Sequence, residues 1–302
     1  MGIFTHNNVV NISIGNNVRY LNDSMDNAFV NCYKLNTPVN IPQGTKSMEY
    51  AFHRCNQFNS QVVIPGSVKT CSFAFGYCSN LRAVPIIEDG VEEISGLFQN
   101  CTNLYNQVTI PSSVTKMTMT FMGCNSYNKP IVVPNKVKSI YKMVENCYYF
   151  NSPVEIPDSV EDCDSAFKNC YTFNQPVKIP NNLKTMDGMF DNCPKFNQTV
   201  NIPSTVTSAT NAFRNCLNFA GNIYINGTEL LNAYCMLNRK NNSKIVNIFI
   251  PANPQYHNTR SSIINTKSNG SIFGTTWSYL SNADNQCIAY NTKLNIYIYN
   301  NL

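Results

Sequence analysis

The feature that most constrains this chain is a cysteine that recurs every 23 residues without an insertion. It occurs at Cys32, Cys55, Cys78, Cys101, Cys124, Cys147, Cys170, Cys193 and Cys216. A fixed period of this size is typical of a solenoid, in which each repeat is one supersecondary unit that stacks on its neighbours. The sequence therefore predicts a stack of rungs rather than two ordinary globular domains.

The residues between successive cysteines follow one pattern, Ala-Phe-x-Asn-Cys-x-x-Phe-Asn-x-x-Val-x-Ile-Pro-x-x-Val-x-x-Met. Val-x-Ile alternates β-branched with variable residues, as a strand with one buried face does. The following Pro ends the strand, because it has no N–H for the ladder. We predict one short parallel strand per repeat, at 39–41, 62–64, 108–110, 131–133, 154–156, 177–179, 200–202 and 223–225. The third repeat reads Pro85-Ile86-Ile87-Glu88 instead, so we expect its strand to be irregular.

The middle residue of each strand is predicted to point away from the core, and we call this set the strand face. Solenoids use such surfaces for recognition, so the strand face is the candidate binding site. Val63, Ile86 and Val132 would expose an apolar patch, which is typical of an interface, although β-branched residues suit any strand face. The strand face comprises Asn40, Val63, Ile86, Thr109, Val132, Glu155, Lys178, Asn201 and Tyr224.

An asparagine follows the second aromatic position in most repeats. Two roles are open for it: a left-handed backbone at a corner, or a side chain that bonds the amides of the neighbouring rung. The residues concerned are Asn36, Asn59, Asn128, Asn151, Asn174 and Asn197.

The 13 cysteines are predicted to be buried, reduced thiols. Cys71 and Cys163 share a repeat position with Met48, Ile94 and Met117, which indicates a core position where Cys acts as a small hydrophobic residue. A disulfide framework is the alternative that the count suggests. No metal site is expected, because the three histidines are isolated and no Cys-x-x-Cys occurs.

The two ends of the chain depart from the repeat. Residues 1–27 are predicted to form an N-terminal cap, residues 28–226 nine repeats, and residues 227–302 a divergent last rung with a β-rich module. Residues 245–251 continue the strand pattern with a spacing of 25 residues, and residues 286–299 are predicted to form a β-hairpin around 291–293. This module either caps the stack or attaches it to a larger assembly, with Trp277, Tyr297 and Tyr299 as candidate attachment residues.

The repeat resembles the BspA-like, Treponema-pallidum-type leucine-rich repeats, which share the joint spacing of Ala-Phe, Cys, Ile-Pro and Val. The match covers about residues 28–226, with Phe often in place of Leu. The resemblance implies an α/β-type but mostly β solenoid: a curved, right-handed leucine-rich-repeat superhelix with a parallel sheet on its concave face. It also implies adhesion and protein or glycan binding, on bacterial surfaces and in some bacteriophage proteins, without catalysis.

Charge and motifs exclude several function classes. The net charge is +5, only 13% of residues are charged, and no basic run occurs, so nucleic acid is not an expected partner. No apolar stretch approaches the roughly 18 residues of a membrane span, and the first residues do not form a signal peptide, so export by the general secretory route is not expected. No convergent titratable groups or phosphate-binding loop point to catalysis or to a cofactor.

These features predict a non-enzymatic recognition or assembly protein. The leading hypothesis is a bacteriophage virion component, such as a tail or capsid fibre, that binds host-surface protein or glycan and contacts other virion proteins, or itself, through the C-terminal module. The alternatives are a bacterial cell-surface or secreted adhesin, and a cytoplasmic interaction scaffold.

Overall fold

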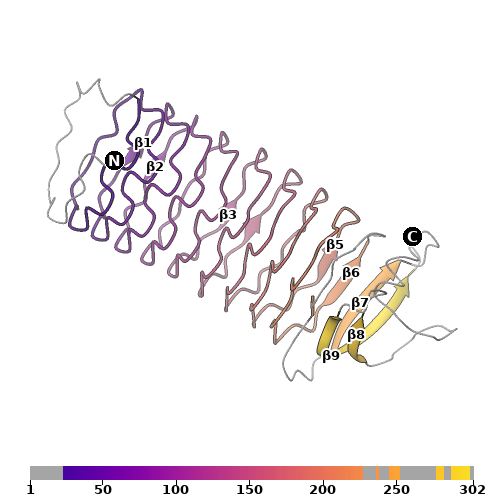
Figure 1. Cartoon of the computed structure of the whole chain (residues 1–302). Helices are drawn as coiled ribbons and strands as arrows, with labels where there is room; N and C mark the ends of the chain where they lie inside the picture. The colour runs from indigo at the N-terminus through magenta and orange to yellow at the C-terminus, as the bar shows by residue number, and fades with distance from the viewer. Residues whose placement is uncertain (1–22, 227–235, 238–244, 252–276, 282–286, 300–302) are drawn as a thin grey trace. The chain divides into compact units, whose positions relative to one another are not determined.

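The computed structural model describes residues 23–226, 236–237, 245–251, 277–281 and 287–299, the last two ranges as backbone only (Figure 1). The chain divides into two compact units, residues 1–152 and 153–302. Most of the predicted N-terminal cap, and the loops of the C-terminal module, lie outside the described residues.

Each unit is a stack of 23-residue rungs with short parallel strands, and no helix occurs in the described residues. The mostly β repeat solenoid is therefore confirmed. The first unit contains β1 (Val63–Ile64), β2 (Ile86–Ile87) and β3 (Ile131–Val132). The second contains β4 (Val154–Glu155), β5 (Val200–Ile202), β6 (Asn222–Ile225), β7 (Ile245–Pro251), β8 (Trp277–Ser281) and β9 (Cys287–Tyr299).

The strands show the predicted alternation of burial. In β5, Val200 and Ile202 are buried and Asn201 is exposed, and β5 pairs in parallel with β6 in a one-repeat register. Segments 39–41, 108–110 and 177–179 also bury their first residue and expose their middle one, but they are not strands. The core pattern is therefore more regular than the backbone pairing.

The third repeat contradicts the expectation of an irregular strand. Its Ile86–Ile87 forms β2, which pairs in parallel with β1. Pro85 takes the buried position that Val has in other rungs. The N–H groups that donate to the preceding rung belong to Ile86 and Glu88, so Pro85 removes neither of these donors.

The C-terminal module extends the sheet of the second unit, whose order is β5-β6-β7-β9-β8. β7 pairs with β6 at the predicted offset of 25 residues, as in Ile223 opposite Ile248. The predicted hairpin within residues 286–299 is wrong, because β9 runs unbroken through Asn291-Thr292-Lys293. A tight two-residue turn requires positive φ angles, which this Gly-free tripeptide does not favour. β9 instead pairs in parallel with β7 and antiparallel with β8.

Each rung also has a segment of eight residues that ends at the repeated cysteine, which we call the turn arm. Its backbone N–H groups alternate between two kinds of acceptor. The N–H of Phe29 donates to Ala51 O (2.7 Å) and that of Asn31 to His53 O (2.9 Å), both in the next rung. The N–H of Cys32 donates within its own rung, to Phe29 O (3.0 Å).

Two left-handed residues in each turn arm produce this alternation. They stand five and one positions before the cysteine, and a regular right-handed helix cannot contain them. Asn and Gly adopt this conformation most easily and fill most of the positions. The residues are Asn27, Tyr50, Phe73, Gly96, Met119, Lys142, Ser165, Gly188 and Asn211, then Asn31, Arg54, Tyr77, Asn100, Gly123, Asn146, Asn169, Asn192 and Asn215.

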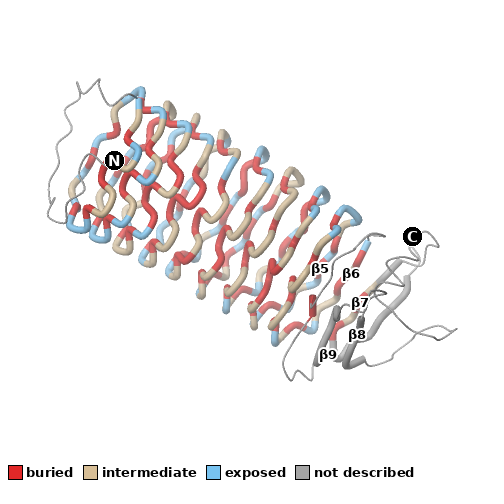
Figure 2. The backbone as a smooth tube through the Cα atoms, in the orientation of Figure 1, coloured by how far each residue is buried: buried red, intermediate tan, exposed pale blue. Residues whose placement is uncertain are grey.

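The core of each unit consists of ladders of identical side chains. Phe52 and Phe75 stack with ring centroids 5.0 Å apart and Phe190 and Phe213 with centroids 5.6 Å apart, so each rung extends the apolar surface of the last. All nine periodic cysteines are buried thiols outside any disulfide, as are Cys71 and Cys163, which confirms the core position. The side chains of Cys235 and Cys287 lie outside the described part of the structure. Buried residues accordingly recur in every rung (Figure 2).

The asparagine after the second aromatic position bonds the neighbouring rung. Asn36 Oδ1 accepts the N–H of Asn59 (2.9 Å), and Asn174 Oδ1 accepts that of Asn197 (2.8 Å). None of these asparagines has a positive φ. Of the two predicted roles, the amide-binding one is therefore correct.

Candidate functional site: the strand face

The strand face is solvent-exposed, as predicted. Its members in the first unit are all exposed, and so are Glu155, Lys178 and Asn201 in the second. Tyr224 is only half-buried, because its ring stacks on Phe249 of β7 at 4.5 Å. Most of the predicted residues are thus accessible to a partner.

In the first unit, three of the five strand-face residues are apolar. Val63 is 41% exposed, Ile86 52% and Val132 59%. Val63 lies directly opposite Ile86 in the β1–β2 pair, so their side chains are neighbours on one face. We call these three residues the apolar patch.

In the second unit the strand face is polar and partly fixed by one carboxylate. Asp158 accepts bonds from Lys178 Nζ (3.2 Å) and from the N–H of Asn181 (2.9 Å). These bonds hold the pKa of Asp158 below its usual value. The bond from the Asn181 N–H has the largest effect, and the bond from Lys178 the next largest. The charge of Lys178 is therefore compensated locally.

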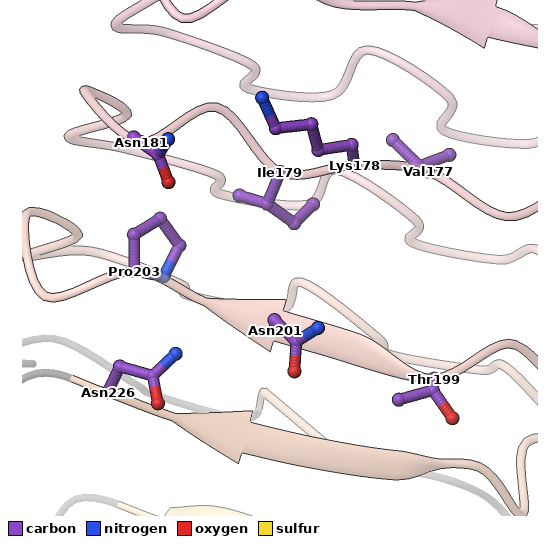
Figure 3. A pocket seen from close by; sticks show the side chains of 8 residues that line it. All are labelled: Val177, Lys178, Ile179, Asn181, Thr199, Asn201, Pro203 and Asn226. Carbon is purple, nitrogen blue, oxygen red and sulfur yellow. The ribbon is translucent and has the colours of Figure 1, made fainter.

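A hollow of about 220 Å³ opens on this polar part of the strand face (Figure 3). Its apolar lining consists of Val177, Ile179 and Pro203. The polar residues that line it are Lys178, Asn181, Thr199, Asn201 and Asn226. Lys178 and Asn201 were predicted as site residues. Thr199, Asn181 and Asn226 were missed, because they lie outside the middle position of the strand.

The predicted attachment residues are defined only in their backbone. Trp277 begins β8, and Tyr297 and Tyr299 lie in β9 opposite Phe249 and Pro251 of β7. Their side chains lie outside the described part of the structure, so their role in attachment stays a prediction.

An exposed aromatic stack on the turn arms was not predicted. The rings of Tyr50 and Phe73 are parallel, with centroids 5.1 Å apart, and His53 lies edge-on to Tyr50. Tyr50 and Phe73 occupy the same left-handed position in successive rungs, where none of the other rungs has an aromatic residue. Two aromatic residues spaced by 23 were the signal that could have revealed this stack.

The described thiols are unsuited to nucleophilic chemistry. Burial raises the pKa of Cys147 to about 12, and it also raises the pKa of Cys101, Cys124 and Cys193. A thiol must ionise to act as a nucleophile or a metal ligand. Among the described residues, no three His, Cys, Asp or Glu side chains are grouped to hold a metal ion.

The family follows from a sequence match that spans most of the chain. The model of the BspA type leucine rich repeat region, six copies long, matches residues 1–128, 95–220 and 143–263. The chain belongs to the BspA-type leucine-rich-repeat family. The buried Cys, Phe and Val-x-Ile positions described above are the core positions of these BspA-type repeats.

One solved structure shows the same fold. A leucine-rich repeat protein from Bacteroides ovatus ATCC 8483 is 22% identical with a TM-score of 0.50, covering 71% of this chain and 64% of that one. A leucine rich cell surface protein from Faecalibacterium prausnitzii A2-165 is also 22% identical, with a TM-score of 0.43, covering 66% and 62%. The BspA-type chain therefore spans less than two thirds of either protein. A search of the curated proteins found no match. In the described residues, no helix has the length and apolar character needed to cross a membrane.

Proposed function

We propose that this chain is a non-enzymatic recognition protein of a bacterial cell surface, which binds a protein partner through the apolar patch. One observation carries this proposal: Val63 and Ile86 lie opposite each other in paired strands and are 41% and 52% exposed. Exposed β-branched neighbours form the kind of apolar surface that marks an interface.

The comparisons support the bacterial surface better than the virion. The BspA-type resemblance implies adhesion on bacterial surfaces and in some bacteriophage proteins, and the similar Bacteroides ovatus structure is that of a bacterial protein. Nothing in the comparisons supports a bacteriophage fibre. Antibodies against the purified chain should therefore label intact cells of the source culture. Labelling only after lysis, or its presence in purified virions instead, would contradict the surface assignment.

The binding surface is tested by charge substitution in the first unit. The fluorescent full chain should bind fixed epithelial cells, and prior trypsin treatment of those cells should remove the binding. Val63→Asp/Val132→Asp should reduce binding at least tenfold, because a carboxylate would be desolvated at the contact. Asn40→Asp, at the same repeat position outside the apolar patch, is the matched control. Equal binding by all three proteins would refute the role of the patch.

A further inference from the structure

Two successive rungs of the second unit are joined on both sides of the strand segment by side chains. On one side, Gln198 Nε2 donates to Asn174 O (2.8 Å). On the other, Thr205 Oγ1 donates to Asn181 O (2.8 Å). The core beneath is stacked, with the rings of Phe173 and Phe196 6.0 Å apart. The rungs are thus held at a fixed spacing around the segment between these bonds.

Between these two junctions the backbone is open. Segment 177–179 forms no backbone hydrogen bond with β5 in the described part of the chain, whereas β5 pairs along its whole length with β6. The hollow of about 220 Å³ lies at this opening (Figure 3). It far exceeds the roughly 15 Å³ that a single water requires.

The hollow offers unused hydrogen-bonding capacity. The Thr199 hydroxyl and the Asn201 carboxamide make no hydrogen bond to other described residues. A hydroxyl and a carboxamide can each donate and accept. Beside them, Val177, Ile179 and Pro203 supply an apolar wall. Polar groups that can donate and accept, next to small apolar surfaces, match a ligand with hydroxyl groups and C–H faces.

The charges at the hollow indicate that this ligand is neutral. Lys178 Nζ lies 3.2 and 3.3 Å from the two carboxylate oxygens of Asp158. The Asn181 carboxamide also donates to Asp158, at 3.0 Å. An anionic ligand would have to compete with Asp158 for Lys178. We propose that the hollow binds one neutral sugar ring of a glycan, through Thr199 and Asn201.

This sugar site is independent of the protein-binding proposal, because the apolar patch belongs to the other unit. The test is saturation-transfer NMR of the full chain with methyl glucoside, methyl galactoside and N-acetylglucosamine, and with N-acetylneuraminic acid as the anionic comparison. A single ring in a small, open site should bind with a dissociation constant on the order of 1 mM. At least one neutral sugar should receive saturation.

Two nearly isosteric variants test the assignment of residues. Thr199→Val and Asn201→Leu keep the side-chain volume and remove the polar atoms, so each should lower the affinity at least tenfold. Asn40→Leu makes the same change at the same repeat position in the other unit and should bind sugar as the native chain does. Unchanged thermal melting of all three shows that the fold is retained.

Three results would overturn the sugar site. These are the absence of transfer to every neutral sugar, transfer that all the variants retain, and binding of N-acetylneuraminic acid alone. If the site instead binds a protein, Asn201→Leu would weaken cell binding that trypsin abolishes while no sugar binds, and this too would refute the proposal.

Discussion

Cys124 Sγ lies 2.9 Å from the carbonyl oxygen of Phe98, one rung earlier in the stack. The same carbonyl accepts the N–H of Cys101 in its own rung at 2.9 Å. The thiol therefore fills the second acceptor site of a buried carbonyl while its sulfur packs as an apolar group. The contact recurs in Cys55, Cys78, Cys101, Cys147, Cys193 and Cys216 at 2.9 to 3.1 Å.

Removing one such thiol should destabilise the protein. Cys124→Ala loses the bond to Phe98 O and leaves a small cavity, at a cost of about 2 kcal/mol in the free energy of unfolding. Urea denaturation under reducing conditions measures this. Cys71→Ala is the control, because it makes the same truncation at a buried thiol whose contact is longer, with a Cys71 Sγ–Glu93 O distance of 3.5 Å. An equal loss in both variants would show that the thiol–carbonyl bond contributes nothing.

Alkaline pH should destabilise the stack through its thiols. Burial raises the pKa of Cys147 from its ordinary value of 9.0 to about 12. The unfolded chain therefore loses this proton first, and the contribution to stability is complete below pH 9 and decreases as the pH rises towards 12. The slope is at most about 1.4 kcal/mol per pH unit for each thiol.

Cys147→Ser provides the comparison for this pH dependence. The hydroxyl does not titrate in this range, so the variant should lose less stability between pH 9 and 11 than the native chain does. Urea denaturation across that range gives both slopes. Identical slopes would mean that Cys147 titrates equally in the folded and unfolded states.

Gly96 and Gly188 have the same φ of +61°. Substitution of each by Ala therefore distinguishes the cost of backbone strain from the cost of a side-chain clash. A Cβ on Gly96 would lie 2.3 Å from the Phe73 ring, whereas one on Gly188 would have nothing nearer than 3.4 Å. Gly188→Ala should cost about 1 kcal/mol for the left-handed conformation alone, and Gly96→Ala about 3 kcal/mol. Thermal unfolding measures both. Adding Phe73→Asn to Gly96→Ala should remove the additional loss of stability, and an unchanged loss would exclude the ring as its cause.

A buried carboxylate in the second unit depends on one arginine. Asp191 is 2% exposed and accepts from Arg214 Nε at 2.9 Å and from Arg214 Nη2 at 2.5 Å. Arg214→Met should cost about 3 kcal/mol, because it leaves the carboxylate buried and unpaired. Asp191→Asn in that background should recover most of the loss. A double variant no more stable than Arg214→Met, measured by urea denaturation, would refute this account.

The sequence predicted the core far better than the backbone pairing. Identical residues at a fixed spacing must occupy equivalent positions, so the buried Cys and Phe ladders and the exposed strand face followed directly. Segment 177–179 has the same Val-x-Ile pattern as segments that pair, so its open backbone left no trace in the sequence. The hollow could therefore not be predicted.

Other features were missed although a signal existed. Asn or Gly precedes the cysteine in seven of nine repeats, which indicates a left-handed residue there. That conformation was considered only for Asn36 and its equivalents, as one of two open roles. The predicted hairpin divided the segment that forms β9 into two strands, because Asn291-Thr292-Lys293 is polar. Pairing with both β7 and β8 overrides that local preference.

The one-way bonding of the turn arms makes the two ends of a stack chemically unlike. In the described residues, every backbone bond between turn arms runs from an N–H to a carbonyl of the following rung, so the dipoles of these peptide groups add along the stack. The turn arm of a first rung thus offers carbonyls as acceptors, and the turn arm of a last rung offers N–H groups as donors. In the last repeat, the N–H of Phe213 donates to Met236 O at 2.8 Å. Without such terminators, copies of the chain could join head to tail into polar filaments. Met236 thus closes the open edge of the last turn arm at one of its N–H groups.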